Sequence, residues 1–233
     1  MEYAIGARYP AAELEQEMFE DVTVIGTGRV GSAMAARLRE RGVAVRDGAG
    51  LRLLCVPDRA IAEVARGIEP GPWVAHGSGG TPLAALDPHT RRFSLHPLQT
   101  LVRSRWPEQL DGAWAAVTGE TEEALLRGRR LAELLGLKPF VLADESRALY
   151  HAGASVASNF LVTLYRAASA LFEEAGAPPE ALVPLMQRTI ENGFELTGPI
   201  ARGDWETVER HRRALRGSGF ERAYDALAEV TRA

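Results

Sequence analysis

The chain has 233 residues, 46% of them hydrophobic and 25% charged, which is enough for one large domain or two modest ones with real cores. Its formal net charge of -4 excludes the strongly basic surface that binds nucleic acid or an anionic membrane, and no apolar run approaches the length of a transmembrane helix. The single cysteine, Cys55, excludes an internal disulfide framework and predicts a cytoplasmic protein. Without an HExxH motif, a paired CxxC or an acidic cluster, no metal is expected.

Residues 1–18 precede the first predicted strand and are an N-terminal extension to which we assign no function. From residue 22 onward, short apolar strands alternate with helices, as in a doubly wound, mostly parallel α/β sheet with right-handed crossovers. The predicted strands are residues 22–25, 43–45, 51–56, 73–76, 92–96, 113–118 and 139–142, and the clearest predicted helices between them are 28–41 and 121–135.

After residue 144 the predicted strands stop. Residues 145–175 predict one long helix that ends at Gly176 and the prolines after it. Further helices are predicted near Pro179, from Asp204 and near Phe220. The expected plan is therefore an extension at 1–18, an α/β domain at 19–143 and an all-α domain at 144–233, with a cleft between the two domains.

The stretch VTVIGTGRVG places Gly26, Gly28 and Gly31 directly after a strand and at the start of a helix. The first glycine permits a tight turn, the second lets the backbone approach a pyrophosphate, and the third lets the helix pack on the strand. Free N–H groups at the helix start would then face the phosphates. This context predicts a Rossmann-like dinucleotide-binding loop, and the alternative is that the glycines serve packing alone. The other loop residues expected to line the cofactor are Thr27, Arg29 and Val30.

Two side chains after the second strand bear on the choice of dinucleotide. Asp47 stands where an acidic residue binds the ribose hydroxyls of NAD, whereas Arg46, together with Arg29, would pair with the 2′-phosphate of NADP. NADP is the cofactor we predict, with NAD as the alternative, and all three charges would otherwise be solvated surface. Val56 and Pro57, after the third strand, are expected along the cofactor. Residues 46–50 are too few for a crossover helix, which predicts an open adenosine pocket.

Ligands of such sheets bind at the carboxyl ends of the strands, so the residues that follow each strand are candidates for chemistry. The fourth strand leads into HGSGG, which contains His76 and Ser78, and the fifth ends in His96 followed by Pro97. His96 is the predicted general acid or base, because a histidine has a near-neutral pKa suited to proton transfer. Ser78 is expected to orient the substrate.

The positions of two other histidines and of the single lysine limit which side chains can act as the general acid or base. His89 and His211 stand among charged residues and are predicted to be solvated. Lys138 precedes the last strand of the first domain, which excludes a lysine of the helical domain as acid or base.

The long helix has two contrasting faces. One face predicts an ordinary core stripe that includes Leu149, Phe160 and Leu164. The opposite face carries small, mostly uncharged side chains. We therefore expect it to line either a substrate cleft or a subunit interface. Its residues are His151, Ser155, Ser158, Asn159, Val162 and Arg166. His151 and Asn159 are expected to orient a substrate beside His96.

Six segments, in chain order, resemble a family of NADP-dependent oxidoreductases that join a Rossmann-like domain to a C-terminal domain of unknown function. They are IGTGRVGSAMAARL, LLCVPDRAIAEV, HGSGG, SLHPLQT, ALYHAGASVASNFLVTL and LTGPIARGDWETVERHRRAL. More distantly the chain is similar to pyrroline-5-carboxylate reductase and prephenate dehydrogenase. The resemblance implies a helical domain like the C-terminal domain of 6-phosphogluconate dehydrogenase and a homodimer formed through it. Prephenate enzymes have a His-Pro after a strand whose histidine contacts the substrate, which His96-Pro97 matches.

Two classes of function fit these features. The first is an NAD(P)-dependent oxidoreductase that transfers hydride between nicotinamide and a carbonyl, imine or alcohol carbon of a small metabolite. The second is a non-catalytic nucleotide-binding sensor or scaffold, which the missing crossover helix favours. A third possibility is a loop that no longer binds any dinucleotide.

Overall fold

The computed structural model describes residues 20–103 and 107–232, so the extension at 1–18 lies outside the described residues. By its internal contacts the chain divides into two compact units, one ending at Val156 and the other starting at Ala157. This division falls inside the helical segment, whereas the predicted domain limit at residue 143 marks where the strands end.

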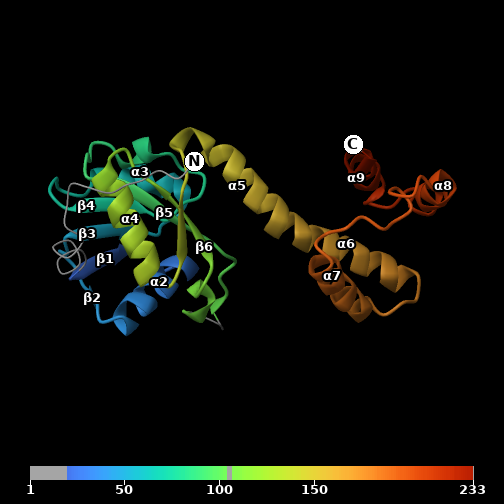
Figure 1. Ribbon diagram of the computed structural model, residues 1–233, viewed down its shortest axis with the longest axis horizontal. Helices are drawn as coiled ribbons and strands as arrows, with labels where there is room; N and C mark the ends of the chain where they lie inside the picture. Colours follow the sequence, from blue (N-terminus) through green and yellow to red (C-terminus); the bar gives the residue numbers. More distant parts are fainter. Residues whose placement is uncertain (1–19, 104–106, 233) are drawn as a thin grey trace. The chain divides into compact units, whose positions relative to one another are not determined.

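The first unit is built on one seven-stranded sheet with the order β2-β1-β3-β4-β5-β6-β7 (Figure 1). All neighbouring strands are parallel except β5 and β6, which are antiparallel. The strands are β1 (Asp21–Ile25), β2 (Ala44–Val45), β3 (Leu51–Leu54), β4 (Trp73–His76), β5 (Arg92–Leu98), β6 (Trp114–Thr118) and β7 (Lys138–Val141). The helices are α2 (Arg29–Glu40), α3 (Asp58–Arg66) and α4 (Glu122–Leu134), with 3₁₀ turns at Leu83–Leu86, Glu108–Leu110 and Asp144–Ser146. The prediction of a mostly parallel α/β sheet is confirmed.

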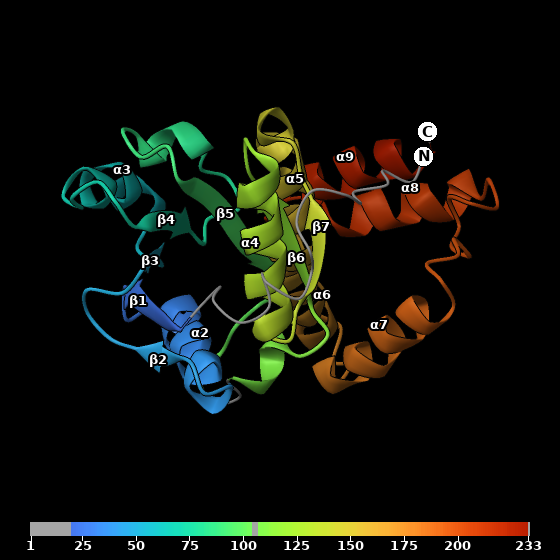
Figure 2. The same ribbon diagram turned by 60° about the vertical axis from the view of Figure 1, so that its left-hand side comes forward.

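Helices cover the sheet on both faces. Figure 2 shows α2 and α4 on one face, where they enclose the larger buried cluster. The other face carries α3 and the turn Leu83–Leu86, whose apolar residues form a second cluster. Right-handed crossovers explain this arrangement, because β6 runs opposite to β5 and its helix α4 therefore returns on the face of α2. The core of this unit thus lies in two layers and leaves the strand ends free for ligands.

The connection from β2 to β3 has no helix. Residues 46–50 pass directly into β3, because Leu51 pairs with Val22 near the beginning of β1. The short crossover read from the sequence is therefore present, and the loop 46–50 lies beside the amino end of the sheet.

A nearly continuous helical segment follows the sheet. It consists of α5 (Arg147–Ser155), a π-helical turn (Val156–Phe160) and α6 (Leu161–Glu174). The predicted single helix is thus interrupted by a π turn, a feature that is often found at functional sites. None of the described helices is both long and apolar enough to cross a membrane.

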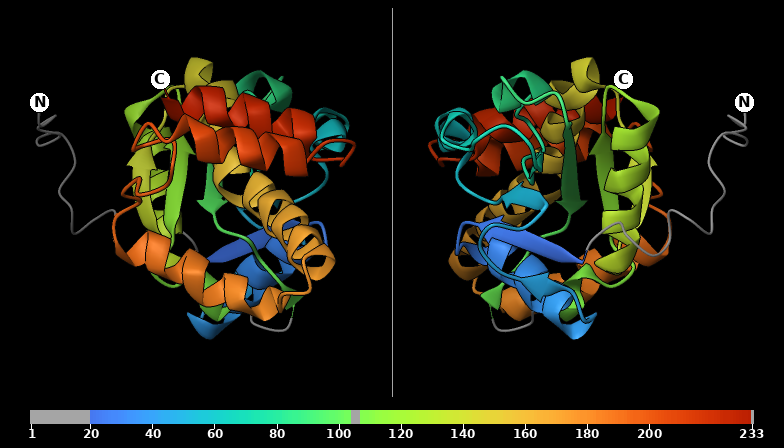
Figure 3. Two further views of the ribbon diagram at one scale, coloured as in Figure 1. Left: turned by 90° about the vertical axis from the view of Figure 1, so that its right-hand side faces the viewer. Right: turned by 90° about the vertical axis from the view of Figure 1, so that its left-hand side faces the viewer.

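The second unit contains α6, α7 (Leu182–Glu191), α8 (Trp205–Ala214) and α9 (Glu221–Arg232), with a 3₁₀ turn at Pro179–Ala181. Figure 3 shows α8 and α9 side by side, and the two helices are in contact. Asp204 begins α8 by accepting a hydrogen bond from the Thr207 N–H at 3.1 Å. The unit is all-α, as predicted.

The apolar stripe of the long helix is not buried. Leu149 is 81% exposed and Phe160 is 57% exposed, so the prediction of an ordinary core stripe is wrong for these positions. Both buried hydrophobic clusters found among the described residues consist of residues from the first unit. Phe160, in the second unit, is thus an apolar side chain that the helices of its own unit leave exposed.

Candidate active site

At two of the three glycines in the loop, packing leaves no room for any side chain. Gly26 adopts φ 116°, and a Cβ there would collide with the carbonyl oxygen of Cys55. A Cβ at Gly31 would collide with the carbonyl oxygen of Gly26 as α2 crosses β1. These two glycines are explained by the fold itself.

Gly28 differs, because a Cβ added there would meet nothing within 4 Å. It is the N-cap residue of α2, and it has no side chain to cap the helix. The first N–H groups of a helix have no partner within it, and the first turn of α2 contains no acidic residue. Thr27 and Arg29 beside it are exposed, and Val30 is half-buried. The loop therefore offers open space and free donors where an anion would bind, so it fits the pyrophosphate of a dinucleotide.

Arg46 and Asp47, the two candidates for binding the adenosine ribose or its 2′-phosphate, differ in whether they already have a partner. The Arg46 Nε donates a hydrogen bond to Asp21 at 2.9 Å, so this guanidinium is directed to the beginning of β1. The pKa of Asp21 is lowered mainly by the Gly50 N–H and then by Arg46. Asp47 is exposed, and among the described residues no hydrogen bond or ion pair is found for its carboxylate. Arg46 would have to leave Asp21 to bind a phosphate, whereas Asp47 is available to ribose hydroxyls.

The residues after β3 lie against the same turn. The Cys55 N–H donates to the Ile25 carbonyl at 2.7 Å, which holds the ends of β1 and β3 together. Val56 follows half-buried and Pro57 exposed at the start of α3. Burial raises the pKa of the Cys55 thiol to about 12, so this cysteine stays protonated. The backbone N of Val56 would lie 3.1 Å from a Cβ added at Gly26, so Val56 is close to the glycine loop. That Val56 and Pro57 lie along a cofactor stays a prediction.

His96 lies within β5 and does not end it, as the sequence analysis had expected. Pairing with the antiparallel β6 extends β5 to Leu98, opposite Trp114. The parallel neighbour β4 pairs only as far as Ser94, opposite His76. His96 is therefore beyond the carboxyl end of β4, at the predicted edge of the sheet.

His96 forms an aromatic cluster with the start of α5. The hydroxyl of Tyr150 is 2.8 Å from the His96 Nδ1, and the two rings meet edge to face. The ring of His151 also meets His96 edge to face, with centroids 5.9 Å apart. Tyr150 was missed by the sequence analysis, although it directly precedes His151. Its position at the beginning of the helix was the available signal.

The His96 imidazole and the Tyr150 phenol both stay neutral near pH 7. Burial lowers the pKa of His96 to about 4, with the neighbouring His151 and Arg147 adding to the effect. Burial also raises the pKa of Tyr150 to about 12. When the Tyr150 hydroxyl donates to Nδ1, the Nε2 of His96 carries the proton, and in the other tautomer Nε2 has a free lone pair. The pair can therefore present either a proton donor or a proton acceptor at Nε2.

The HGSGG loop packs on this cluster through its glycines. A Cβ at Gly79 would lie 2.8 Å from both His96 and His151, so only glycine leaves room for the two rings. The Ser78 hydroxyl accepts the Thr81 N–H at 3.0 Å and the Gly80 N–H at 3.3 Å. Ser78 thus shapes the loop, and its predicted role in orienting a substrate stays a prediction.

A buried arginine joins the loop to α5. Arg147 is 2% exposed and donates from Nε to Asp144 at 2.7 Å and from Nη1 to the Ser78 carbonyl at 3.2 Å. Its Nη2 also contacts the Ser94 hydroxyl on β5. Burial lowers the pKa of Arg147, and the hydrogen bond to Asp144 opposes this shift. Arg147 holds together the three elements that carry His96, Gly79 and Tyr150.

Two other residues considered in the sequence analysis, His76 and Asn159, are not found in the His96 cluster. His76 is fully buried, and its Nδ1 accepts the Ser78 N–H at 3.3 Å. Burial lowers the pKa of His76 to about 4. Asn159 lies in the π turn, past the division of the chain after Val156, so its role beside His96 stays a prediction. The described residues contain no cluster of three His, Cys, Asp or Glu that could hold a metal.

Solved structures share this fold over nearly the whole chain. The crystal structure of BF3122 from Bacteroides fragilis, which carries the provisional name of an NADP oxidoreductase, matches with a TM-score of 0.77 and 20% identity, covering 92% of this chain and 98% of that one. Protein TM1727 from Thermotoga maritima matches with a TM-score of 0.73 and 26% identity, covering 91% and 96%.

More distant matches are those that the resemblance implied. The 1-pyrroline-5-carboxylate reductase of Streptococcus pyogenes matches with a TM-score of 0.59 and 13% identity over 91% of this chain and 98% of that one. The prephenate dehydrogenase of Aquifex aeolicus matches with a TM-score of 0.54 and 14% identity over 92% and 99%. At these identities the likeness establishes the fold, which is the one used by NAD(P)-dependent oxidoreductases.

No curated protein matches the chain. The family model described as Domain of unknown function (DUF2520) matches residues 113–231, which is just over half of the chain. The chain is therefore a member of the DUF2520 family.

Proposed function

We propose that this protein is an NAD(P)-dependent oxidoreductase that transfers hydride between a nicotinamide and a carbonyl, imine or alcohol carbon of a small metabolite. The observation that carries the proposal is the open space at Gly28. The fold explains the other two glycines of the loop but leaves this one without a packing partner, as a site for pyrophosphate requires.

The residues of the first unit would divide the work as follows. The N–H groups at the start of α2 would bind the pyrophosphate, and Val56 and Pro57 would lie along the cofactor. A bound nicotinamide supplies the hydride or accepts it. His96 would exchange a proton with the substrate oxygen or nitrogen at Nε2, while Tyr150 sets the tautomer from Nδ1. His151 would position the substrate beside His96.

The test is a titration of the full chain with NADPH and NADH, followed by nicotinamide fluorescence and by melting temperature. Wild-type protein should bind one of them saturably and be stabilised by it. Gly28→Asp should weaken binding by at least about 100-fold, because its carboxylate would accept hydrogen bonds from the free N–H groups at the start of α2 and repel the phosphates. Gly219→Asp is the matched control, since a Cβ there also meets nothing within 4 Å, and it should bind as wild type does.

Each outcome separates the candidate functions. Preference for NADPH would assign Arg46 or Arg29 to the 2′-phosphate, and preference for NADH would assign Asp47 to the ribose. Binding without turnover across ketones, imines and hydroxy acids would instead favour a nucleotide sensor, which the missing helix between β2 and β3 also favours. Absence of binding to either dinucleotide would rule out both functions.

We infer that the functional form is a homodimer built through the C-terminal helices. Large apolar side chains of the second unit are exposed, although such patches on soluble monomers are normally small. They are Phe160, Leu161, Val162, Leu164, Val183, Leu185, Ile190, Phe194, Leu196, Trp205, Leu227 and Val230. Light scattering on the full chain should give twice the 25.3 kDa mass of one chain. A monomer at micromolar concentration would contradict this inference, and Leu185→Glu should shift the equilibrium toward monomer, whereas Arg166→Glu on an already polar position should have a smaller effect.

A further inference from the structure

A cavity lies at the amino ends of β1, β3 and β4, whereas the glycine loop follows the carboxyl end of β1. Its volume is about 610 Å³, within the range of sites that hold small metabolites. The lining comes from the residues that begin β1, β3 and β4, together with one side chain each from α4 and the loop before β5. Ligand sites of this fold are expected at the carboxyl ends of strands, so the proposed oxidoreductase reaction gives this cavity no role.

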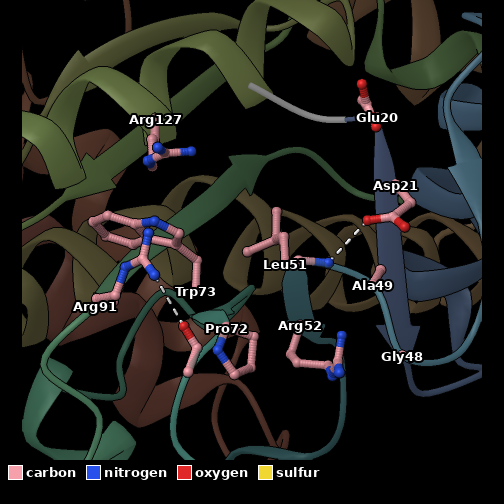
Figure 4. Close-up of a pocket in the computed structure, with 12 residues that line it drawn as sticks. Glu20, Asp21, Gly48, Ala49, Leu51, Arg52, Pro72, Trp73, Arg91 and Arg127 are labelled. Carbon is pink, nitrogen blue, oxygen red and sulfur yellow. Dashed lines mark hydrogen bonds between the residues drawn. The ribbon is translucent and has the colours of Figure 1, made fainter. Parts of the chain in front are cut away.

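One wall of the cavity combines an indole with two guanidinium groups. Figure 4 shows Trp73, Arg91 and Arg127 gathered on one side. The Arg127 guanidinium is 4.9 Å and the Arg91 guanidinium 5.3 Å from the Trp73 ring centroid. Arg52 adds a third guanidinium to the lining, from β3.

The indole N–H of Trp73 lacks an acceptor. Trp73 is 6% exposed, and its Nε1 has no hydrogen-bond partner among the described residues. The arginines against the indole cannot help, because a guanidinium has donors only. Buried donors without acceptors are uncommon in folded proteins. An oxyanion between these groups would accept from the indole and the guanidinium groups together.

Two of the arginines have no carboxylate partner. Arg91 donates to the Gly71 carbonyl at 3.0 Å, and Arg52 donates to the Thr23 hydroxyl at 3.2 Å. Neither is found in an ion pair within the described parts of the chain, whereas Arg127 is paired with Glu123 at 3.1 Å. The Arg127 pair uses Nε and Nη2 and leaves Nη1 for a further acceptor. Arg91 can therefore take a negative charge without displacing a carboxylate, and Arg127 can donate to the same anion from Nη1.

The opposite wall limits how many charges the ligand has. Figure 4 places Glu20 and Asp21 across the cavity, with Leu51 between the two walls. A second anionic group would meet these carboxylates, while Leu51 and Pro72 offer apolar contact to a carbon skeleton. We propose that this cavity binds a small organic anion with one carboxylate or phosphate head, held by Arg91, Arg127 and the Trp73 N–H, and with an apolar body over Leu51 and Pro72.

The experiment is calorimetric titration of the full chain with benzoate and with phenyl phosphate, and with benzamide as the uncharged isostere of benzoate. At least one anion should bind saturably while benzamide does not. Binding of benzoate alone would assign a carboxylate head, and binding of phenyl phosphate alone a phosphate head. Binding of neither, or equal binding of benzamide, would overturn the proposal.

Variants locate the binding. Arg91→Gln and Arg127→Gln should each weaken anion binding, the first by at least about tenfold, because a charge-assisted hydrogen bond to the head group is lost. Arg39→Gln, an exposed arginine at the end of α2, is the matched control and should bind as wild type does. Gly28→Asp should leave anion binding unchanged. If Gly28→Asp abolishes binding, or if Arg91→Gln does not affect it, the anion is held at the glycine loop or elsewhere, and the cavity is not the site.

Discussion

Replacing His96 by alanine should lower turnover by about 10²- to 10⁴-fold and leave the affinity for the dinucleotide within about twofold. The imidazole meets Tyr150 and His151 at the carboxyl edge of the sheet, whereas the loop that would bind the cofactor is made by backbone groups of other residues. The proton step and cofactor binding should therefore separate. Turnover would be measured with whichever ketone, imine or hydroxy acid proves to be reduced or oxidised.

The chain offers a matched control for this variant. The Nδ1 of His211 is 2.8 Å from the Tyr224 hydroxyl, and the two rings meet edge to face, as in the pair His96 and Tyr150. In this second pair His211, on α8, is exposed and Tyr224, on α9, is half-buried. His211→Ala should leave turnover unchanged, so equal losses in both variants would remove His96 from the catalytic role.

The pH dependence gives an independent check. Because burial lowers the pKa of His96 to about 4, its imidazole should remain neutral from pH 7 down to about pH 5. NMR titration of the ring should show protonation well below the value of 6.5 typical of exposed histidine. Protonation near pH 6.5 in the free protein would mean that the ring is solvated and that the cluster with Tyr150 and His151 is open.

The strand positions and the glycine loop could be predicted because they depend on local patterns. Apolar runs, glycine spacing and the length of each connection are all readable along the chain. The short connection at residues 46–50 was visible in the same way. The extent of β5 was not, because it is set by pairing with the antiparallel β6, and that partner cannot be recognised from periodicity within β5.

The histidines show where local reading fails. His89 stands among charges in the sequence and was predicted to be solvated, yet it is buried and its Nε2 is 2.8 Å from the Ala65 carbonyl at the end of α3. That prediction was wrong because its partner comes from a different element. His211, which is exposed, was predicted correctly. A charged neighbourhood in sequence therefore does not determine burial in the fold.

The long helix shows a different limit of prediction from sequence. Its amphipathic pattern identifies a stripe that favours burial, but the pattern does not say what buries it. Leu149 and Phe160 belong to that stripe and are exposed. Tyr150, on the turn that meets His96, gave no periodic signal, since only the tertiary position of α5 makes it part of the candidate site.

Arg147→Met should lower the free energy of unfolding by about 3–5 kcal/mol, the largest stability effect expected of any single change at the site. Arg147 is almost fully buried, and its loss would leave the Ser78 carbonyl and the Ser94 hydroxyl without their donor and Asp144 without its counter-charge. Asp144 is 33% exposed, so water will relieve part of this cost and favour the lower end of the range. Urea denaturation would measure the change.

Arg130→Met is the matched control, because Arg130 pairs with Glu133 on the surface of α4 at 3.1 Å and is 41% exposed. Its loss should cost no more than about 1 kcal/mol. A second measurement distinguishes a local role from general destabilisation. Because the positive charge of Arg147 lowers the pKa of His96, folded Arg147→Met protein should show His96 titrating at a higher pH than wild type. A loss of stability similar to that of the control, with no shift in the His96 titration, would mean that Arg147 neither holds the loop to α5 nor sets the charge state of the histidine.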